Sequence, residues 1–177
     1  MIKAVFFDLY QTLAGYDPPR EEIEAAILKD NDISIKPEAL QVPFSVADAF
    51  FHKESARRPF SKMSRNEQQS FFAEYQTRLL AEAGIEPAMK LVKDIIIKWH
   101  SHKFKLILFD DALPAIKELG SNGLILGLIS NIERDITPLL EELGLSESLE
   151  VVTTSLEAGY AKPNPEIFKT ALEGGGG

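Results

Sequence analysis

The stretch MIKAVFFDLYQTLAG, residues 1–15, decides how the rest of the chain is interpreted. Its apolar run from Ile2 to Phe7 predicts a buried β-strand, and this run ends in a carboxylate, Asp8, with Thr12 shortly after it. A carboxylate at the mouth of a buried strand loses hydration, so it is unfavourable there unless another group interacts with it. The remainder of the chain has to supply that group.

Composition describes an acidic globular protein. The chain has 177 residues, of which 45% are hydrophobic, enough to form a substantial core. Its 27 acidic and 19 basic residues give a formal net charge of -8, which argues against nucleic acid or an anionic membrane as the main partner. Cysteine is absent, and no stretch reaches the roughly 18 apolar residues of a membrane span. With no signal-peptide pattern at the start, these features predict a cytoplasmic protein.

Two further apolar runs have the pattern of the first. LILGLIS (124–130) and EVVTT (150–154) predict strands, each ending in small or polar residues. The segment between them predicts a helix, because apolar residues recur at helical spacing before a terminal glycine, namely Ile136, Leu139, Leu140, Leu143 and Gly144. DDALPAIKELGSNG (110–123) predicts another helix, with Asp110 or Asp111 as its cap. Strands that alternate with helices indicate an α/β fold with a parallel sheet.

The segment from about Asp17 to Lys105 interrupts this alternation. Its periodicity predicts four helices and no strand, over Glu21–Leu28, Val46–Ser55, Asn66–Ala83 and Ala88–His100. We therefore expect residues 1–16 and 106–177 to form an α/β core, with residues 17–105 as an inserted helical cap. Within the cap, the phenylalanines Phe50, Phe51, Phe71 and Phe72 are expected in the core, as is Trp99, whereas His100 and His102 are expected at the surface.

Polar residues follow each predicted core strand. In a parallel α/β sheet, ligands bind beyond the carboxyl ends of the strands, so these side chains are the candidates for chemistry. They are Asp8, Tyr10 and Thr12, then Ser130 and Asn131, then Lys162 in the loop SLEAGYAKPNP (155–165). A carboxylate can attack an electrophilic carbon or phosphorus, a hydroxyl and an amide can bind the transferred group, and a lysine can neutralise negative charge. Each residue alone is typical of a turn or helix cap, but their joint order favours a site.

Three segments resemble known motifs. FFDLYQTL (6–13), LGLISN (126–131) and AGYAKPNPEIF (158–168) resemble the first three motifs of the haloacid dehalogenase (HAD) superfamily, in the same order. This resemblance implies a Rossmann-like core with an inserted helical cap. It further implies that Asp8 is the nucleophile, Ser130 binds the transferred group and Lys162 orients the nucleophile. Thr12 would shape the nucleophile loop, and Asn131 would contact a small anionic substrate.

The resemblance leaves the substrate class open between a small haloacid and a phosphate ester. Phosphatases of the superfamily have a second Asp where this chain has Tyr10, and a phenol with a reference pKa of about 10 is a poor base at neutral pH. The L-2-haloacid dehalogenases do have a Tyr there, but they follow it with a Gly where this chain has Gln11. A phosphatase would use Mg²⁺, with Asp8 and the backbone carbonyl of Tyr10 as ligands, whereas a dehalogenase would need no cofactor.

A fourth motif, expected beyond the helix that begins at Pro165, does not occur in the sequence. The terminal stretch ALEGGGG (171–177) is interpreted as a truncation or linker rather than a native end. Three hypotheses therefore remain: a hydrolase, a catalytically impaired binding or regulatory protein, and an inert truncated chain. An exposed edge of the first strand would favour a homodimer.

Overall fold

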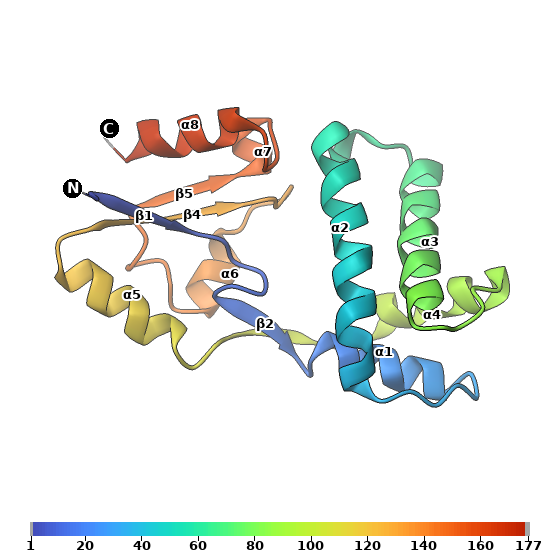
Figure 1. The fold of residues 1–177 in the computed structure, drawn as a ribbon. Coiled ribbons are helices and arrows are strands. Elements are labelled where there is room, and N and C mark those ends of the chain that lie inside the picture. Colours follow the sequence, from blue (N-terminus) through green and yellow to red (C-terminus); the bar gives the residue numbers. More distant parts are fainter. Residues whose placement is uncertain (1, 176–177) are drawn as a thin grey trace. The chain divides into compact units, whose positions relative to one another are not determined.

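The computed structural model describes residues 2–175, and its contacts divide the chain into two compact units (Figure 1). One comprises residues 1–15 with 106–177, and the other comprises residues 16–105. Tyr16 therefore belongs with the helical segment, although the sequence placed it in the α/β core. Within residues 2–175, no helix is long and apolar enough to cross a membrane. The final glycines of the predicted linker, 176–177, lie outside the described residues.

The first unit contains a parallel three-stranded sheet in the order β1-β4-β5. Its strands are β1 (Ala4–Phe7), β4 (Ile125–Ser130) and β5 (Val151–Thr154). Their register pairs Phe7 with Leu128 and Ser130 with Thr154, so all three strands end at the same edge of the sheet. The α/β fold with a parallel sheet, predicted from the alternation of strands and helices, is confirmed.

The first strand differs from its prediction in burial. All four residues of β1 are half-buried rather than fully buried, because β1 lies at one edge of the sheet that the described residues form. The central strand β4 is buried over nearly its whole length. Gly127 of β4 has no room for a side chain, since an added Cβ would lie 2.5 Å from the ring of Phe6 in the neighbouring strand.

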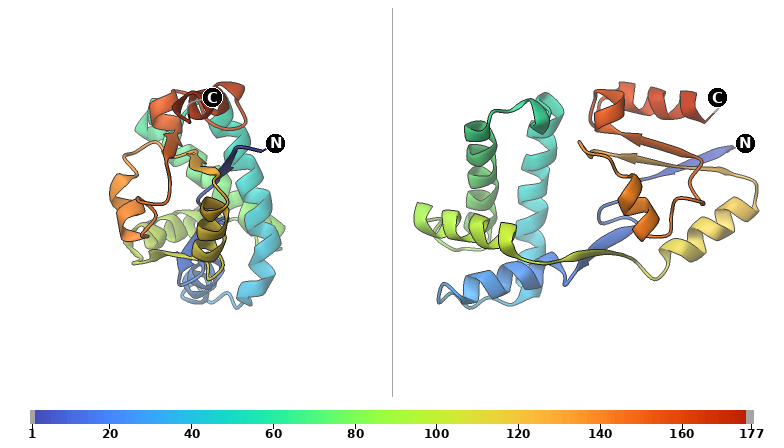
Figure 2. Two further views of the ribbon diagram at one scale, coloured as in Figure 1. Left: turned by 90° about the vertical axis from the view of Figure 1, so that its left-hand side faces the viewer. Right: turned by 180° about the vertical axis from the view of Figure 1, so that it is seen from behind.

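Helices cover both faces of this sheet (Figures 1 and 2). The helices α5 (Ala112–Ser121) and α6 (Thr137–Glu142) pack on one face, and α8 (Pro165–Gly174) packs on the other. Consecutive residues of β4 contact these two sides: Leu128 belongs to the cluster with α5 and α6, and Ile129 to the cluster with α8. This alternation is the two-residue period of a strand, and it places β4 in the middle of the core.

The second unit is helical. It contains α1 (Arg20–Lys29), α2 (Gln41–Arg57), α3 (Arg65–Glu82), α4 (Met89–Ser101) and two 3-10 turns, η1 (Pro37–Leu40) and η2 (Phe60–Lys62). The helix α2 begins before the predicted Val46, because Pro43 lies in its first turn, where a missing N–H costs no hydrogen bond. The core is mostly aliphatic and includes Ile23, Leu28, Leu40, Leu79, Leu80 and Ile95.

The expected phenylalanine core is only partly correct. Phe71 is buried, whereas Phe50, Phe51 and Phe72 are half-buried and make tilted or edge-to-face ring contacts with one another through Phe71. These rings form a separate group rather than part of the main cluster of the helical unit. Their helical spacing correctly brought them to one face, but spacing does not distinguish the centre of a helical bundle from one end of it.

Two strands were missed by the sequence analysis. β2 (Ala14–Asp17) and β3 (Lys105–Leu108) form a two-stranded sheet where connecting segments were expected. Beside it, the amide of Phe109 donates to the carbonyl of Leu13 at 2.9 Å, and the ring of Phe109 lies so close to Gly15 that an added Cβ would be 3.0 Å from it. Each strand is short, and its partner is distant in sequence, so neither gives a clear local pattern.

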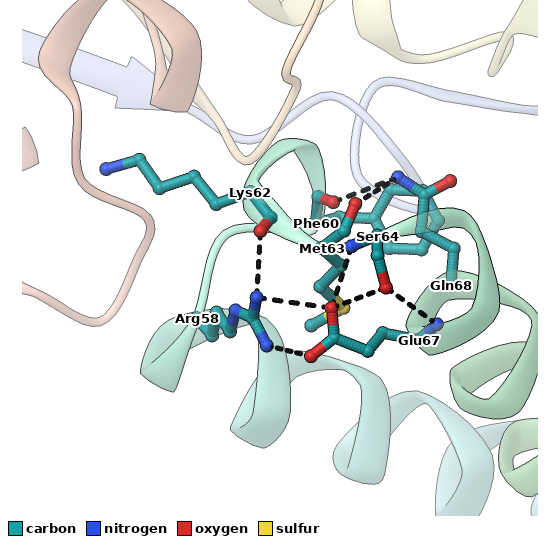
Figure 3. A network of polar contacts seen from close by, with 7 residues as sticks. All are labelled: Arg58, Phe60, Lys62, Met63, Ser64, Glu67 and Gln68. Carbon is teal, nitrogen blue, oxygen red and sulfur yellow. Dashed lines mark hydrogen bonds and ion pairs between the residues drawn. The ribbon is translucent and has the colours of Figure 1, made fainter.

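The corner between α2 and α3 is held by a network of polar contacts (Figure 3). Arg58 donates to the carbonyl oxygen of Lys62 at 2.9 Å and to both carboxylate oxygens of Glu67. Ser64 begins α3 with a capping box, in which its hydroxyl accepts from the amide of Glu67 and the Glu67 carboxylate accepts from the amide of Ser64. These donors lower the pKa of Glu67 to about 2.

A buried carboxyl group lies inside the helical unit. Glu24 of α1 is fully buried, and its two oxygens accept hydrogen bonds from the Gln76 amide and the Trp99 indole. Both donors are neutral, and among residues 2–175 no cation forms an ion pair with it. Burial therefore raises the pKa of Glu24, although the two hydrogen bonds oppose the shift.

Replacing Glu24 with Gln should change how the stability of the helical unit depends on pH. A raised folded-state pKa means that Glu24 contributes stability below its unfolded pKa and loses that contribution as the pH rises through the folded pKa. Wild type should therefore lose stability relative to Glu24→Gln over the pH range that begins at the unfolded glutamate pKa, about 4.3, and extends upward. Urea unfolding followed by circular dichroism across this range measures the difference, and a difference independent of pH would contradict the assignment.

Candidate active site

The candidate site begins where β1 ends. Asp8 directly follows β1, and its side chain is 39% exposed. The chain then turns tightly, because the amides of Leu13 and Ala14 both donate to the carbonyl oxygen of Leu9, at 2.9 and 3.0 Å. Leu9 itself is fully buried in the α/β core. The turn is thus held by its hydrogen bonds to the buried Leu9, while the carboxylate of Asp8 stays accessible at the edge of the sheet.

Lys162 connects Asp8 to the central strand. Its ammonium group donates to Oδ1 of Asp8 at 2.7 Å and to the carbonyl oxygen of Ile129 at 2.7 Å. A charge-assisted bond of this kind fixes both side chains more strongly than a neutral one. Oδ1 of Asp8 is therefore held, whereas Oδ2 has no hydrogen-bond partner among residues 2–175. This geometry presents one carboxylate oxygen for reaction.

The loop that carries Lys162 is fixed by Asn131. The Asn131 side chain donates to the carbonyl of Lys162 at 3.1 Å and accepts from the amide of Lys162 at 2.6 Å. The loop lies between α7 (Ser155–Ala158), which Thr154 caps, and α8, whose first turn is capped by Asn164. The structure therefore gives Asn131 a role in positioning Lys162. The substrate contact expected for Asn131 stays a prediction.

The other predicted site residues lie at the same edge of the unit or close to it. Ser130 ends β4 and is buried beside its strand partner Thr154. Thr12 is exposed in the turn after β1, where its amide donates to Leu9. The half-buried side chain of Tyr10 packs against the α/β core cluster. The structure thus joins Asp8, Asn131 and Lys162 by direct bonds and places the remaining residues near them in the chain.

Sequence reasoning missed one member of the site and misjudged another residue. The carbonyl oxygen of Ile129 binds Lys162, but a backbone acceptor has no signature in the sequence. Asp111 was expected to cap the helix before the second core strand. It does occupy the N-cap position of α5, yet its side chain makes no capping hydrogen bond, because its backbone is helical (φ -90°, ψ -10°) rather than extended as in an ordinary cap.

Gln11 adopts a backbone conformation that few side chains accept. Its φ is 60°, in the left-handed region that glycine occupies without strain. This is the position where the dehalogenase motif has Gly, so the structure gives a physical reason for that preference. Gln11 lies within a hydrogen-bonded turn, in which its amide donates to the carbonyl of Ala14 at 2.8 Å.

The residues present do not fit a complete magnesium site. Only the Asp8 carboxylate and the Tyr10 carbonyl were expected as ligands, and within residues 2–175 no group of three or more acidic or histidine side chains could hold a metal. The ammonium of Lys162 already occupies one oxygen of Asp8. Mg²⁺ prefers six oxygen ligands, so these two groups alone would leave most of its coordination to water or substrate.

Comparisons with known proteins agree with this architecture. The family model of the haloacid dehalogenase-like hydrolases matches residues 2–174. Human haloacid dehalogenase-like hydrolase domain-containing protein 3 is 28% identical over 97% of this chain and 68% of its own length. A glyceraldehyde 3-phosphate phosphatase of Methanothermobacter thermautotrophicus is 30% identical over 97% of this chain and 71% of its own. The crystal structure of the L-2-haloacid dehalogenase RSc1362 superposes with a TM-score of 0.61 at 19% identity, covering 99% of this chain and 73% of that one.

The chain therefore belongs to the haloacid dehalogenase-like hydrolases. The family model covers nearly all of the sequence, and the fold and the order of the motifs agree with it. The assignment defines a class of hydrolase. The identity of the nucleophile and of the substrate is a separate question, which depends on the site residues.

Replacing Gln11 with Gly should stabilise the α/β unit. Glycine relieves the left-handed strain, which costs a residue with a side chain about 1 kcal/mol, although part of this gain is lost to the larger entropy of unfolded glycine. Thermal unfolding of Gln11→Gly should show a melting temperature above that of wild type. Gln69 serves as the control, because it is an exposed residue in the middle of a regular helix, α3, where glycine is unfavourable; Gln69→Gly should lower the melting temperature. A decrease at both positions would show that the turn is unstrained.

Proposed function

We propose that the protein hydrolyses a small anionic substrate and that Asp8 is the nucleophile. The observation that carries this proposal is the paired contact of Lys162, which holds Oδ1 of Asp8 and the Ile129 carbonyl while Oδ2 stays open. A salt bridge with a purely structural role would gain little here, because both side chains are partly exposed and solvent screens their attraction. The geometry is better suited to orienting a carboxylate for attack.

The proposed reaction has two steps. Oδ2 of Asp8 attacks the electrophilic carbon or phosphorus, a new bond to oxygen forms, and the leaving group departs with the bonding electrons. Water then cleaves the resulting aspartyl ester, which releases the hydroxylated product and a proton and restores the carboxylate. The ammonium of Lys162 offsets the negative charge that the carboxylate and an anionic substrate bring together. Ser130 is proposed to bind the transferred group.

Tyr10 favours a leaving group that needs no proton. In the phosphatase reaction an acid must protonate a departing alkoxide, and this chain has a phenol at that position, packed against the core. A halide is stable as an anion and leaves without a proton. We therefore propose a small 2-haloacid as the first substrate class to test.

Replacing Asp8 with Asn should abolish turnover. The amide keeps the shape of the side chain but cannot form the ester, so the rate should fall to a few per cent of wild type or less, whereas the unfolding midpoint should change little. Chloride release from 2-chloropropionate without metal and phosphate release from a panel of esters with and without Mg²⁺ measure the activity. The same substitution at an exposed position of the helical unit, Asp32→Asn, serves as the control and should retain full activity.

Two results would count against this proposal. Substantial residual activity in a preparation of Asp8→Asn free of deamidation would exclude Asp8 as the nucleophile. Wild type that is folded yet inactive on both substrate classes would favour the other two hypotheses, a binding or regulatory protein and an inert truncated chain.

Phosphate ester hydrolysis is the second candidate function, and its support is the similarity to a relative named as a phosphatase. Under this alternative, and where the acidic ligands of the family's fourth motif are present, Tyr10→Asp should create or raise phosphatase activity that depends on Mg²⁺, because it supplies an acid and base beside Asp8. The matched variant Tyr10→Asn has nearly the same shape without a titratable group and should not. No gain in Tyr10→Asp, together with dehalogenation by wild type, would leave the carbon-centred reaction as the function.

A further inference from the structure

A hollow of about 870 Å³ lies at the C-terminal end of α4 in the helical unit. Its walls include Trp99, His100, His102, Lys103, Phe104 and Lys105. None of these residues belongs to the candidate active site, and the proposed reaction does not use them. The volume is within the range of about 300–1,000 Å³ that is typical of sites for small molecules.

One wall of the hollow consists of aromatic rings held in place. The ring of Phe104 makes edge-to-face contacts with Tyr16, at a centroid distance of 4.8 Å, and with Trp99, at 6.3 Å. The indole of Trp99 is in turn fixed by its hydrogen bond to the buried Glu24. Phe104 is nevertheless 42% exposed. A large ring that is both fixed and accessible offers a surface on which another flat ring can stack.

The hollow is also locally cationic in an acidic protein. The stretch IIIKWHSHKFKLILF (95–109) contains three lysines and two histidines but no acidic residue, whereas the whole chain has a formal net charge of -8. Lys103 and Lys105 are exposed, and within residues 2–175 their ammonium groups form no ion pair. Lys98, by contrast, is paired with Asp30 and Asp94. The lining has one acidic residue, Asp17, so the two free lysines outnumber it.

We propose that this hollow binds a phosphorylated aromatic compound of the nucleotide type. The flat ring would stack on Phe104 beside Trp99, and the phosphate would be bound by Lys103 and Lys105, with the imidazoles of His100 and His102 as further polar partners. Aromatic rings alone would suit a neutral ligand, and lysines alone would suit any anion. Their convergence in one hollow selects a ligand that carries both features.

The protein contains an internal reporter for this site, because Trp99 is the only tryptophan in the chain. Titration with AMP should quench its fluorescence to saturation. Because adenine absorbs ultraviolet light and could lower the fluorescence without binding, calorimetry with the same ligand measures the binding independently. Ribose 5-phosphate, which lacks the ring, and adenosine, which lacks the phosphate, should each bind at least about tenfold more weakly, as expected for the loss of one charged hydrogen bond or stacking contact. Use of the Asp8→Asn variant prevents turnover of AMP during the titration.

Two lysine pairs provide the matched test. Lys103→Met with Lys105→Met keeps the length of the side chains but removes both charges, and it should weaken AMP binding about tenfold or more. Lys90→Met with Lys93→Met makes the same charge change at exposed positions of α4 outside the hollow and should leave binding unchanged. Circular dichroism verifies that all variants are folded.

The proposal also requires the aromatic wall. Phe104→Leu keeps an apolar side chain of similar bulk, and it should reduce the affinity for AMP to that for ribose 5-phosphate. AMP binding that is absent in wild type, equal for AMP and ribose 5-phosphate, or unaffected by loss of Lys103 and Lys105 would overturn it.

Discussion

The candidate site depends on the ammonium group of Lys162, which makes hydrogen bonds to two neighbouring parts of the sheet. Lys162 binds the carboxylate that follows β1 and a carbonyl of β4, so it requires the parallel pairing of these strands to be in register. That pairing in turn requires Gly127, where any side chain would meet the ring of Phe6. The question raised by a carboxylate at the end of an apolar strand thus has a physical answer: the loop after β5 supplies the cation.

The sequence predicted this arrangement because its signals are local. Each core strand is an apolar run that ends in polar residues, and parallel strands place those ends together, so the sequence alone assigns Asp8, Ser130 and Lys162 to one edge. The contacts that could not be predicted are not local. β2 and β3 pair although the whole helical segment separates them in the sequence. Ile129 binds Lys162 through its backbone carbonyl, which has no sequence signature. The contact between Phe50 and Phe71 joins two different helices, α2 and α3.

The helical unit contains two carboxyl groups in opposite environments. Glu24 is surrounded by the core and bound by neutral donors, so the loss of hydration outweighs the two hydrogen bonds and its pKa rises. Glu67 is exposed and bound by Arg58 and Ser64, so its ionised form is favoured and its pKa falls. Glu67 lies in the first turn of α3, in a capping box that the Ser three residues before it already indicates in the sequence, whereas Glu24 lies beyond the first turn of α1. The burial of Glu24 and its two neutral donors, by contrast, come from helices distant in the sequence.

The side chain of Asn131 binds only the backbone of Lys162, at both its amide and its carbonyl. The path of the loop is therefore encoded separately from the chemistry of the side chain that it presents. Any residue other than proline at this position keeps the backbone amide and carbonyl that Asn131 binds, whereas the contacts with Asp8 and Ile129 belong to the lysine side chain. A substitution at position 162 would therefore separate two functions, since it removes the charge beside Asp8 without removing the hydrogen bonds that hold the loop.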